Sequence, residues 1–208
     1  EWALTTVHRR YLNAPIYAVG VSLGGNFLAK YLGDRGPKAE FLTAAVAVGA
    51  PMDLVAGAEI VSHGANKLYA EMFLSTLKQK VLDKARRFPD IIDIEKVKHC
   101  HTLYDFDSIY TAPIHGFKSA MEYWTKCSAK TVLKNVRVPL LLLNAKNDPF
   151  QPSWALPTEK DVSDSVYLEQ PEEGGHIGFP RGNPPGDLGW LPERIMQFFA
   201  GFEPKIEK

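Results

Sequence analysis

The stretch IYAVGVSLGGNFLAKYLG, residues 16–33, carries the patterns that decide the fold. Residues 16–21 form a short apolar run rich in β-branched and aromatic side chains, which predicts a buried strand. A glycine-rich turn around Ser22 follows at once, and apolar residues then recur at three- and four-residue spacing over residues 27–32, as in an amphipathic helix. The sequence therefore predicts a strand, a sharp turn and a helix in direct succession.

The same alternation continues along the chain. Further apolar runs predict buried strands at residues 44–48, 139–144 and 166–170, and helical periodicity is found at 54–61 and 191–202. Strands that alternate with helices are typical of an α/β fold with a mostly parallel sheet and flanking helices.

The pattern changes at about residues 63–134, where charged helical segments precede two aromatic-rich stretches, 104–110 and 117–124. We interpret this region as a helical cap inserted between core strands. The same periodicity fits crossover helices that cover the sheet, so the sequence leaves both alternatives open.

Composition excludes several classes of protein. The chain has 208 residues, 24 basic and 24 acidic, so its formal net charge of zero gives no general attraction to nucleic acid. A membrane span needs about 18 consecutive apolar residues, and the sequence contains no such run. Cys100 and Cys127 are expected to be reduced thiols, although a single bridge in an oxidising compartment stays open. The cytoplasm is the expected compartment.

The segment Gly20-Val21-Ser22-Leu23-Gly24 matches the Gly-x-Ser-x-Gly nucleophile elbow, whose glycines give steric room to a strained turn. Such a turn, between a strand and a helix, presents the serine hydroxyl at the edge of the sheet. The backbone N–H of Leu23, at the start of the helix, is the expected oxyanion donor. A plain glycine-rich turn is the alternative interpretation.

A serine hydroxyl becomes a strong nucleophile only when a base takes its proton. His176 is the candidate base, because it lies in a glycine-rich loop after the last predicted strand. The other histidines precede the elbow or lie in the predicted cap, and ordinary surface or core roles are expected for them: His8, His63, His99, His101 and His115. Asp148, which follows the predicted strand at 139–144 and precedes a proline, is the candidate carboxylate that orients the base. An exposed turn aspartate is the alternative for Asp148 taken alone.

The chain order Ser22, Asp148, His176 is that of the α/β-hydrolases and differs from the orders in chymotrypsin- and subtilisin-like proteases. Four blocks extend the comparison: residues 20–33 (GVSLGGNFLAKYLG), 111–117 (TAPIHGF), 144–150 (NAKNDPF) and 174–179 (GGHIGF). Together they resemble the YheT-like α/β-hydrolases, often called the AB hydrolase 4 family, over nearly the whole chain.

The resemblance implies an esterase-like enzyme acting on carboxylic esters with lipid-like or short- to medium-chain acyl groups. It places the nucleophile, acid and base on Ser22, Asp148 and His176. Asn147 stands where relatives usually carry aspartate, a departure expected to matter little. The family also has strands and an oxyanion loop before the elbow. We therefore expect residues 1–208 to be the C-terminal portion of one α/β-hydrolase domain that lacks its N-terminal strands and second oxyanion donor.

Two hypotheses follow from the sequence. The first is a serine carboxylic-ester hydrolase that works through an acyl-enzyme on a small-molecule ester, with thioesterase, lipase, peptidase or acyltransferase chemistry left open. The second is a truncated or inactive α/β-hydrolase-like binding module. No metal and no cofactor are expected, because the sequence shows neither a grouped ligand set nor a phosphate loop. Phe106, Phe117, Trp124 and Phe150 are expected either to line an acyl pocket or to belong to the core.

Overall fold

The computed structural model describes residues 1–88, 92–183 and 186–203. The chain divides into two compact units, which are described separately below. The first, called the sheet unit, comprises Glu1–Met52 and Ser128–Lys208. The second, called the helical unit, is Asp53–Cys127.

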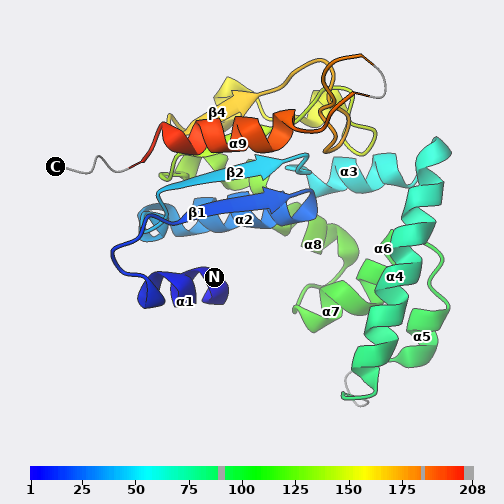
Figure 1. Cartoon of the computed structure of the whole chain (residues 1–208). Coiled ribbons are helices and arrows are strands. Elements are labelled where there is room, and N and C mark those ends of the chain that lie inside the picture. Colours follow the sequence, from blue (N-terminus) through cyan, green and yellow to red (C-terminus); the bar gives the residue numbers. More distant parts are fainter. Residues whose placement is uncertain (89–91, 184–185, 204–208) are drawn as a thin grey trace. The chain divides into compact units, whose positions relative to one another are not determined.

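A four-stranded, fully parallel sheet forms the centre of the sheet unit (Figure 1). Its strands are β1 (Tyr17–Val21), β2 (Ala44–Val48), β3 (Leu140–Leu143) and β4 (Val166–Glu169), and their order in the sheet follows their order in the chain. Every residue of β2 and β3 is buried, as expected for central parallel strands that are covered on both faces. The predicted α/β architecture is confirmed.

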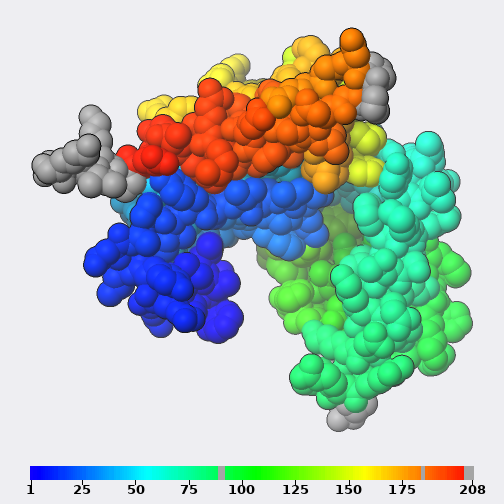
Figure 2. Space-filling view, in the orientation of Figure 1, coloured from blue at the N-terminus to red at the C-terminus, as the bar shows by residue number. Residues whose placement is uncertain are grey.

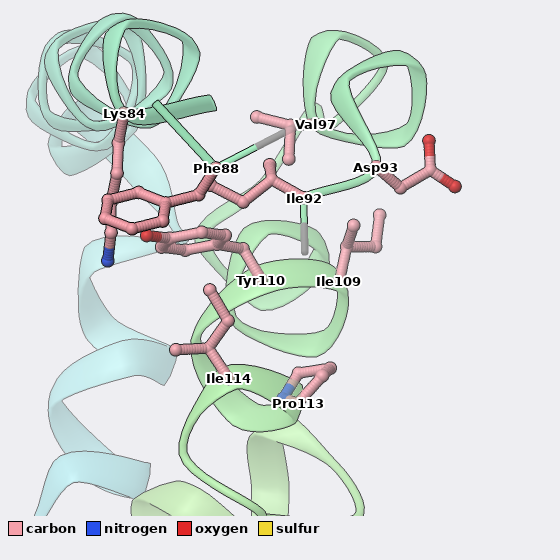
Figure 3. A pocket seen from close by; sticks show the side chains of 9 residues that line it. All are labelled: Lys84, Phe88, Ile92, Asp93, Val97, Ile109, Tyr110, Pro113 and Ile114. Carbon is pink, nitrogen blue, oxygen red and sulfur yellow. The ribbon is translucent and has the colours of Figure 1, made fainter. Parts of the chain in front are cut away.

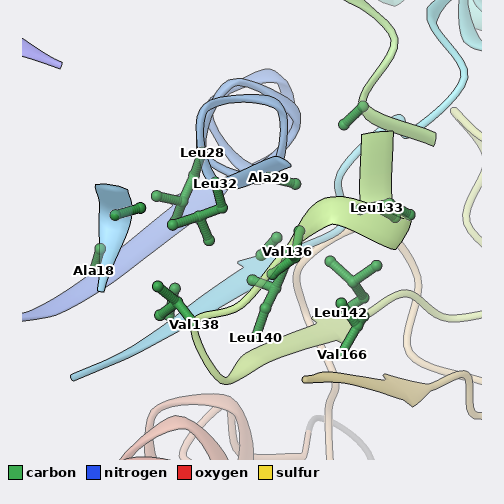
Figure 4. Packing of buried hydrophobic residues seen from close by; sticks show 14 of the residues in the cluster. Ala18, Leu28, Ala29, Leu32, Leu133, Val136, Val138, Leu140, Leu142 and Val166 are labelled. Atoms are coloured by element: carbon green, nitrogen blue, oxygen red, sulfur yellow. The ribbon is translucent and has the colours of Figure 1, made fainter. Parts of the chain in front are cut away.

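Each face of this sheet is covered by a long helix. Because side chains alternate across a strand, the two central strands supply two separate clusters. One contains Ala45, Ala47, Leu140 and Leu142 with α2 (Leu23–Arg35). Figure 4 shows Leu140 and Leu142 of this cluster together with Leu28 and Leu32 of α2. The other contains Val46, Val48, Leu141 and Leu143 with α9 (Trp190–Ala200). The outer side of α9 is exposed, as the red and orange surface in Figure 2 shows.

Short helices complete the sheet unit. They are α1 (Trp2–Arg10) and the 3₁₀ turns η1 (Gly36–Ala39), η4 (Ala129–Asn135), η5 (Ser153–Ala155) and η6 (Glu159–Asp161). The η4 turn packs along α2, where the buried Asn26 side chain accepts a hydrogen bond from the Ala129 N–H at 2.9 Å. Residues 129–135 therefore belong to the covering layer of the sheet.

The helical unit contains no strand among its described residues. Its elements are α3 (Leu54–Val61), η2 (Gly64–Asn66), α4 (Lys67–Ala85), α5 (Ile94–Lys98), α6 (Leu103–Phe106), the π-helical turn η3 (Asp107–Thr111), α7 (Ala112–Ile114) and α8 (Ala120–Cys127). A core led by Leu74, Val81, Val97 and Phe106 joins α4 to α5 and α6. Both cysteines lie in this unit and no disulfide joins them in the structure, and their reduced state stays a prediction.

The insertion predicted at about residues 63–134 overlaps the helical unit. The compact unit itself begins earlier, at Asp53, where the side chain caps α3 by accepting from the N–H groups of Val55 and Ala56. It ends earlier too, since residues 129–135 pack on α2 of the sheet unit. That this unit acts as a cap stays a prediction. No helix in the described part of the chain is long and apolar enough to cross a membrane.

The helical unit also holds a pocket of about 520 Å³ (Figure 3). Its lining is mainly apolar and includes Phe88, Ile92, Val97, Ile109, Tyr110, Pro113 and Ile114, with Lys84 and Asp93 as its charged members. The Lys84 ammonium lies 5.8 Å from the centre of the Tyr110 ring, within the range of a cation–π contact. Asp93 caps α5 and pairs with Lys96, so its charge serves the helix start.

A carboxyl group in the helical unit should make stability depend on pH. Burial raises the pKa of the Asp107 carboxyl, against the opposing effect of hydrogen bonds from Thr111 and from Trp124, whose Nε1 donates at 2.7 Å. A raised folded-state pKa stabilises the fold fully below the unfolded pKa, and this contribution is lost as pH rises through the folded value. Asp107→Asn, which cannot ionise, should therefore gain stability relative to the wild type as pH rises above about 4, the ordinary pKa of an aspartate.

Thermal unfolding of both proteins across this pH range measures the difference. Asp105→Asn is the matched control, because a backbone hydrogen bond from His101, followed by others from Thr102, lowers the pKa of the Asp105 carboxyl. A lowered pKa gives the opposite sign, so this variant should lose stability relative to the wild type as pH rises. Parallel curves of melting temperature against pH for the wild type and Asp107→Asn would contradict the expectation.

Candidate active site

Ser22 lies at the sharp turn between β1 and α2, as the sequence predicts. Its backbone has φ 52° and ψ −128°, and Phe179 is the only other non-glycine residue with positive φ in the described part of the chain. Such a conformation costs roughly 1–3 kcal/mol and persists only where surrounding contacts enforce it. The N–H of Ser22 donates to the Val48 carbonyl at 2.8 Å, which ties the strained residue to the end of β2.

Close packing at this turn explains two of its glycines. A Cβ on Gly20 would lie 2.5 Å from the Gly24 carbonyl oxygen, and a Cβ on Gly25 would lie 2.6 Å from the Ala50 Cβ. A Cβ on Gly24 would meet nothing within 4 Å. The expectation that Gly24 is needed for steric room is therefore wrong. Gly25, the next residue, makes the close approach in its place, because α2 starts directly against the end of β2.

His176 connects the two other predicted site residues. Its Nε2 lies 2.9 Å from Ser22 Oγ and its Nδ1 lies 2.8 Å from Asp148 Oδ2. The imidazole is 18% exposed and the Asp148 carboxylate is fully buried. All three residues belong to the sheet unit, at loops that follow β1, β3 and β4. The structure thus brings together the three side chains that the sequence singled out.

The carboxylate fixes the tautomer of the imidazole. Asp148 can only accept, so Nδ1 must carry the proton it donates to Oδ2, and Nε2 is left as the acceptor for the Ser22 hydroxyl. The aspartate is itself held by its turn, since the Phe150 N–H donates to Oδ1 at 2.8 Å and the Gln151 N–H reaches the Asp148 carbonyl at 3.3 Å. Pro149 occupies the position that favours such a turn.

The N–H of Leu23 begins helix α2 directly after Ser22. The first four N–H groups of a helix have no partner within it and carry partial positive charge. This position matches the one predicted for an oxyanion donor. The Leu23 side chain is 42% exposed, and the oxyanion role of its backbone N–H stays a prediction.

The remaining histidines in the structure have other surroundings. The His63 and His99 rings each contact the carbonyl of the residue four positions earlier, Glu59 at 2.6 Å and Glu95 at 2.7 Å, at the ends of helices α3 and α5. The His8 ring packs on Phe41 at 4.8 Å. These contacts agree with the ordinary roles expected from the sequence.

Of the four aromatic residues considered for an acyl pocket, one lies beside the site. The Phe150 ring meets the His176 ring edge-on, with centroids 4.8 Å apart. Phe106 and Trp124 are 3% and 9% exposed and belong to the core of the helical unit. The Phe117 ring packs against Tyr123 at 5.5 Å. Of these four residues, Phe150 is therefore the one that lies next to His176.

No group of three His, Cys, Asp or Glu side chains that could hold a metal ion occurs within the described ranges.

Asn147 has a structural contact that the sequence did not suggest. Its Oδ1 accepts a hydrogen bond from the Gly175 N–H at 2.8 Å, which fastens the loop that carries His176 to the loop that carries Asp148. An aspartate in this position would offer the same acceptor oxygen. The sequence feature that could have indicated this contact is the position of Asn147 directly before Asp148.

Removing this acceptor should loosen the histidine loop. Under the sequence-based hypothesis of an ester hydrolase, we expect Asn147→Ala to lower kcat about fivefold, the effect of losing one hydrogen bond of about 1 kcal/mol, and Asn147→Asp to keep most of the activity. Steady-state kinetics of the three proteins measures this difference. Equal losses in both variants would show that the bond to Gly175 is not what matters.

Comparisons with known proteins support the fold and the resemblance. No protein-family model matches the chain. "Putative esterase YheT" of Escherichia coli is 34% identical over 204 residues, which cover 97% of this chain and 60% of that protein. Phospholipase ABHD3 of Bos taurus is 34% identical over 200 residues, covering 95% of this chain and 48% of that protein.

Among solved structures, an acylaminoacyl peptidase of Pyrococcus horikoshii superposes with a TM-score of 0.56 at 18% identity, over 99% of this chain and 27% of that one. This likeness bears on the fold alone. The chain spans about half to three-fifths of the length of the two curated relatives. Over that length, the predicted resemblance to the YheT-like α/β-hydrolases is confirmed, and the fold of the chain is that of an α/β-hydrolase.

Proposed function

We propose that this chain carries the catalytic groups of a serine ester hydrolase, with Ser22 as nucleophile, His176 as general base and Asp148 as the carboxylate that orients it. One observation carries the proposal. A continuous line of hydrogen bonds runs from Ser22 Oγ through both ring nitrogens of His176 to Asp148 Oδ2, with heavy-atom distances of 2.9 and 2.8 Å. These are the distances that a proton transfer from serine to imidazole requires.

In the acylation step, Ser22 Oγ attacks the carbonyl carbon of the ester while His176 Nε2 takes the hydroxyl proton. The imidazolium that forms is stabilised by the buried Asp148 carboxylate at Nδ1. The carbonyl oxygen becomes an oxyanion, and the Leu23 N–H at the start of α2 is proposed to donate to it. Collapse of the tetrahedral intermediate breaks the ester C–O bond, and His176 returns the proton to the leaving alcohol.

Deacylation repeats these steps with water. His176 Nε2 takes a proton from a water molecule, whose oxygen attacks the acyl carbon bound to Ser22. The second tetrahedral intermediate then expels Ser22 Oγ, which recovers its proton from the imidazolium, and the carboxylic acid leaves. The protein ends in its starting state without a cofactor.

The proposed substrates are carboxylic esters with lipid-like or short- to medium-chain acyl groups. Two relatives are named an esterase and a phospholipase. The Phe150 ring lies beside the His176 ring, and an apolar side chain in this position supports an acyl chain over a charged group as the part of the substrate that binds there.

Hydrolysis of p-nitrophenyl esters of increasing acyl length tests the proposal. The full-length protein should release p-nitrophenol, and Ser22→Ala should lower kcat at least about 10³-fold with the fold intact by circular dichroism. Ser62→Ala is a matched control, because the Ser62 hydroxyl only donates to the Ala58 carbonyl at the end of α3. Wild-type and Ser22→Ala proteins with the same low activity would favour a binding module instead.

A further inference from the structure

Two buried amide side chains extend the line of hydrogen bonds beyond the candidate triad. Gln151 Nε2 donates to Asp148 Oδ2 at 3.2 Å, and Asn144 Nδ2 donates to Gln151 Oε1 at 3.1 Å. Asn144 Nδ2 also donates to the Ala50 carbonyl at 3.0 Å. Gln151 is 6% exposed and Asn144 is 1% exposed, so water does not compete for these bonds. The mechanism proposed above uses neither residue.

The orientation of both side-chain amides is fixed by the groups at the two ends of this line of hydrogen bonds. A backbone carbonyl can only accept, so Ala50 requires the NH₂ group of Asn144 to face it. That NH₂ group has a second hydrogen, which goes to Gln151 Oε1 and thereby turns the Gln151 NH₂ group toward Asp148. The Asp148 carboxylate is likewise only an acceptor. Reversing either amide would bring two acceptors together in a buried place, which costs free energy.

The ends of the sheet's strands hold these two hydrogen-bonded amides in place. Ala50 follows β2, and Asn144 follows β3 directly, with its own N–H bonded to the Glu169 carbonyl of β4 at 3.0 Å. The Asp148 carboxylate is therefore tied, through two amides, to the ends of three parallel strands. A side chain held by packed and hydrogen-bonded neighbours keeps its partner in place better than one on a free loop.

We propose that Gln151 and Asn144 are positioning residues that hold the Asp148 carboxylate in the orientation needed to receive the Nδ1 proton of His176. This inference rests on the proposed function, since it assigns these amides to the same reaction. They act through Asp148. Loss of the Gln151 side-chain NH₂ group should leave the carboxylate with one donor fewer and more freedom to rotate.

Gln151→Met removes the donor while it keeps a side chain of similar length. We expect kcat of ester hydrolysis to fall about tenfold with KM within a factor of two, since a hydrogen bond to a charged group is lost and substrate contacts are untouched. Gln170→Met is the matched control. Gln170 is a half-buried glutamine whose Nε2 donates to the Pro157 carbonyl at 2.7 Å, away from Asp148, so kcat should not change.

Gln151→Glu gives a readout that a merely structural role would not move. The new carboxyl keeps the shape of the amide but faces Asp148 with a like charge once it ionises. Asp148 and His176 are the titratable groups on this line of hydrogen bonds. Additional negative charge favours the protonated imidazole, so the acid limb of the kcat/KM profile should move to higher pH. If the acid limb of the Gln151→Glu profile does not move and kcat of Gln151→Met is unchanged, the inference is wrong.

A measurement without substrate separates this inference from the proposed function. The Nδ1 proton of His176, shared with Asp148, should give a low-field ¹H NMR signal that His176→Gln abolishes. Gln151→Met should shift or broaden this signal, whereas Gln170→Met should leave it unchanged. An inactive wild type with these spectral changes would refute the esterase proposal alone. An active wild type whose signal and kinetics ignore residue 151 would refute the positioning role alone.

Discussion

Asp148→Asn is expected to lower kcat of ester hydrolysis by about 10⁴-fold while leaving the fold intact. The asparagine can present its NH₂ group to His176 Nδ1, which would then act as an acceptor and move the ring proton to Nε2. With Nε2 protonated, the imidazole cannot take the proton of the Ser22 hydroxyl 2.9 Å away. The loss of the buried charge also removes the stabilisation of the imidazolium. Single-turnover kinetics with a p-nitrophenyl ester measures the acylation rate directly.

Asp164→Asn is the control for this substitution. Asp164 is exposed in the loop before β4, and changes at such surface positions seldom affect stability by more than about 0.5 kcal/mol. Its kcat should match the wild type. Acylation by Asp148→Asn within about tenfold of the wild-type rate would show that this carboxylate does not set the state of His176.

Gly49→Ala is expected to combine a loss of stability with a loss of activity. Gly49 follows β2 with φ +55°, and a Cβ there would lie 2.3 Å from the His176 carbonyl oxygen. A left-handed backbone costs alanine about 1–2 kcal/mol, and the overlap should cost about 1–3 kcal/mol more. If the loop yields, His176 moves from Ser22, and a displacement of about 1 Å can lower kcat about 100-fold. Chemical denaturation and ester kinetics measure both effects.

Gly64→Ala isolates the backbone contribution. Gly64 has nearly the same φ, +58°, but a Cβ there would meet nothing within 4 Å. This variant should lose about 1–2 kcal/mol and keep the kcat of the wild type. Equal stability losses for the two variants, with kcat unchanged in both, would contradict the close packing of Gly49 against the histidine loop.

The parts of this molecule that follow from local pattern could be predicted from the sequence. The four strands read as apolar runs because central parallel strands are buried on both faces. Ser22 could be identified as the candidate nucleophile because its strand, turn and helix are contiguous in the chain. Asp148 and His176 each looked ordinary alone, and their order relative to Ser22 is what made them candidates.

Contacts between distant loops could not be predicted in the same way. The role of Gly49 depends on the path of the His176 loop, more than a hundred residues later in the chain. Gln151 and Asn144 have polar side chains that are common in loops, and only the approach of the Ala50 carbonyl gives their amides a direction. The start of the helical unit at Asp53 likewise depends on packing, because the helical periodicity there resembles that of a crossover helix.

The central claim is that His176, held by Asp148, activates Ser22. Its most direct test is treatment of the protein with a fluorophosphonate probe, followed by peptide mass spectrometry to locate the adduct. We predict one phosphonyl group on Ser22 in the wild type and labelling at least about 10³-fold slower in His176→Ala. A probe attached to another residue, or equal rates in the two proteins, would contradict this account.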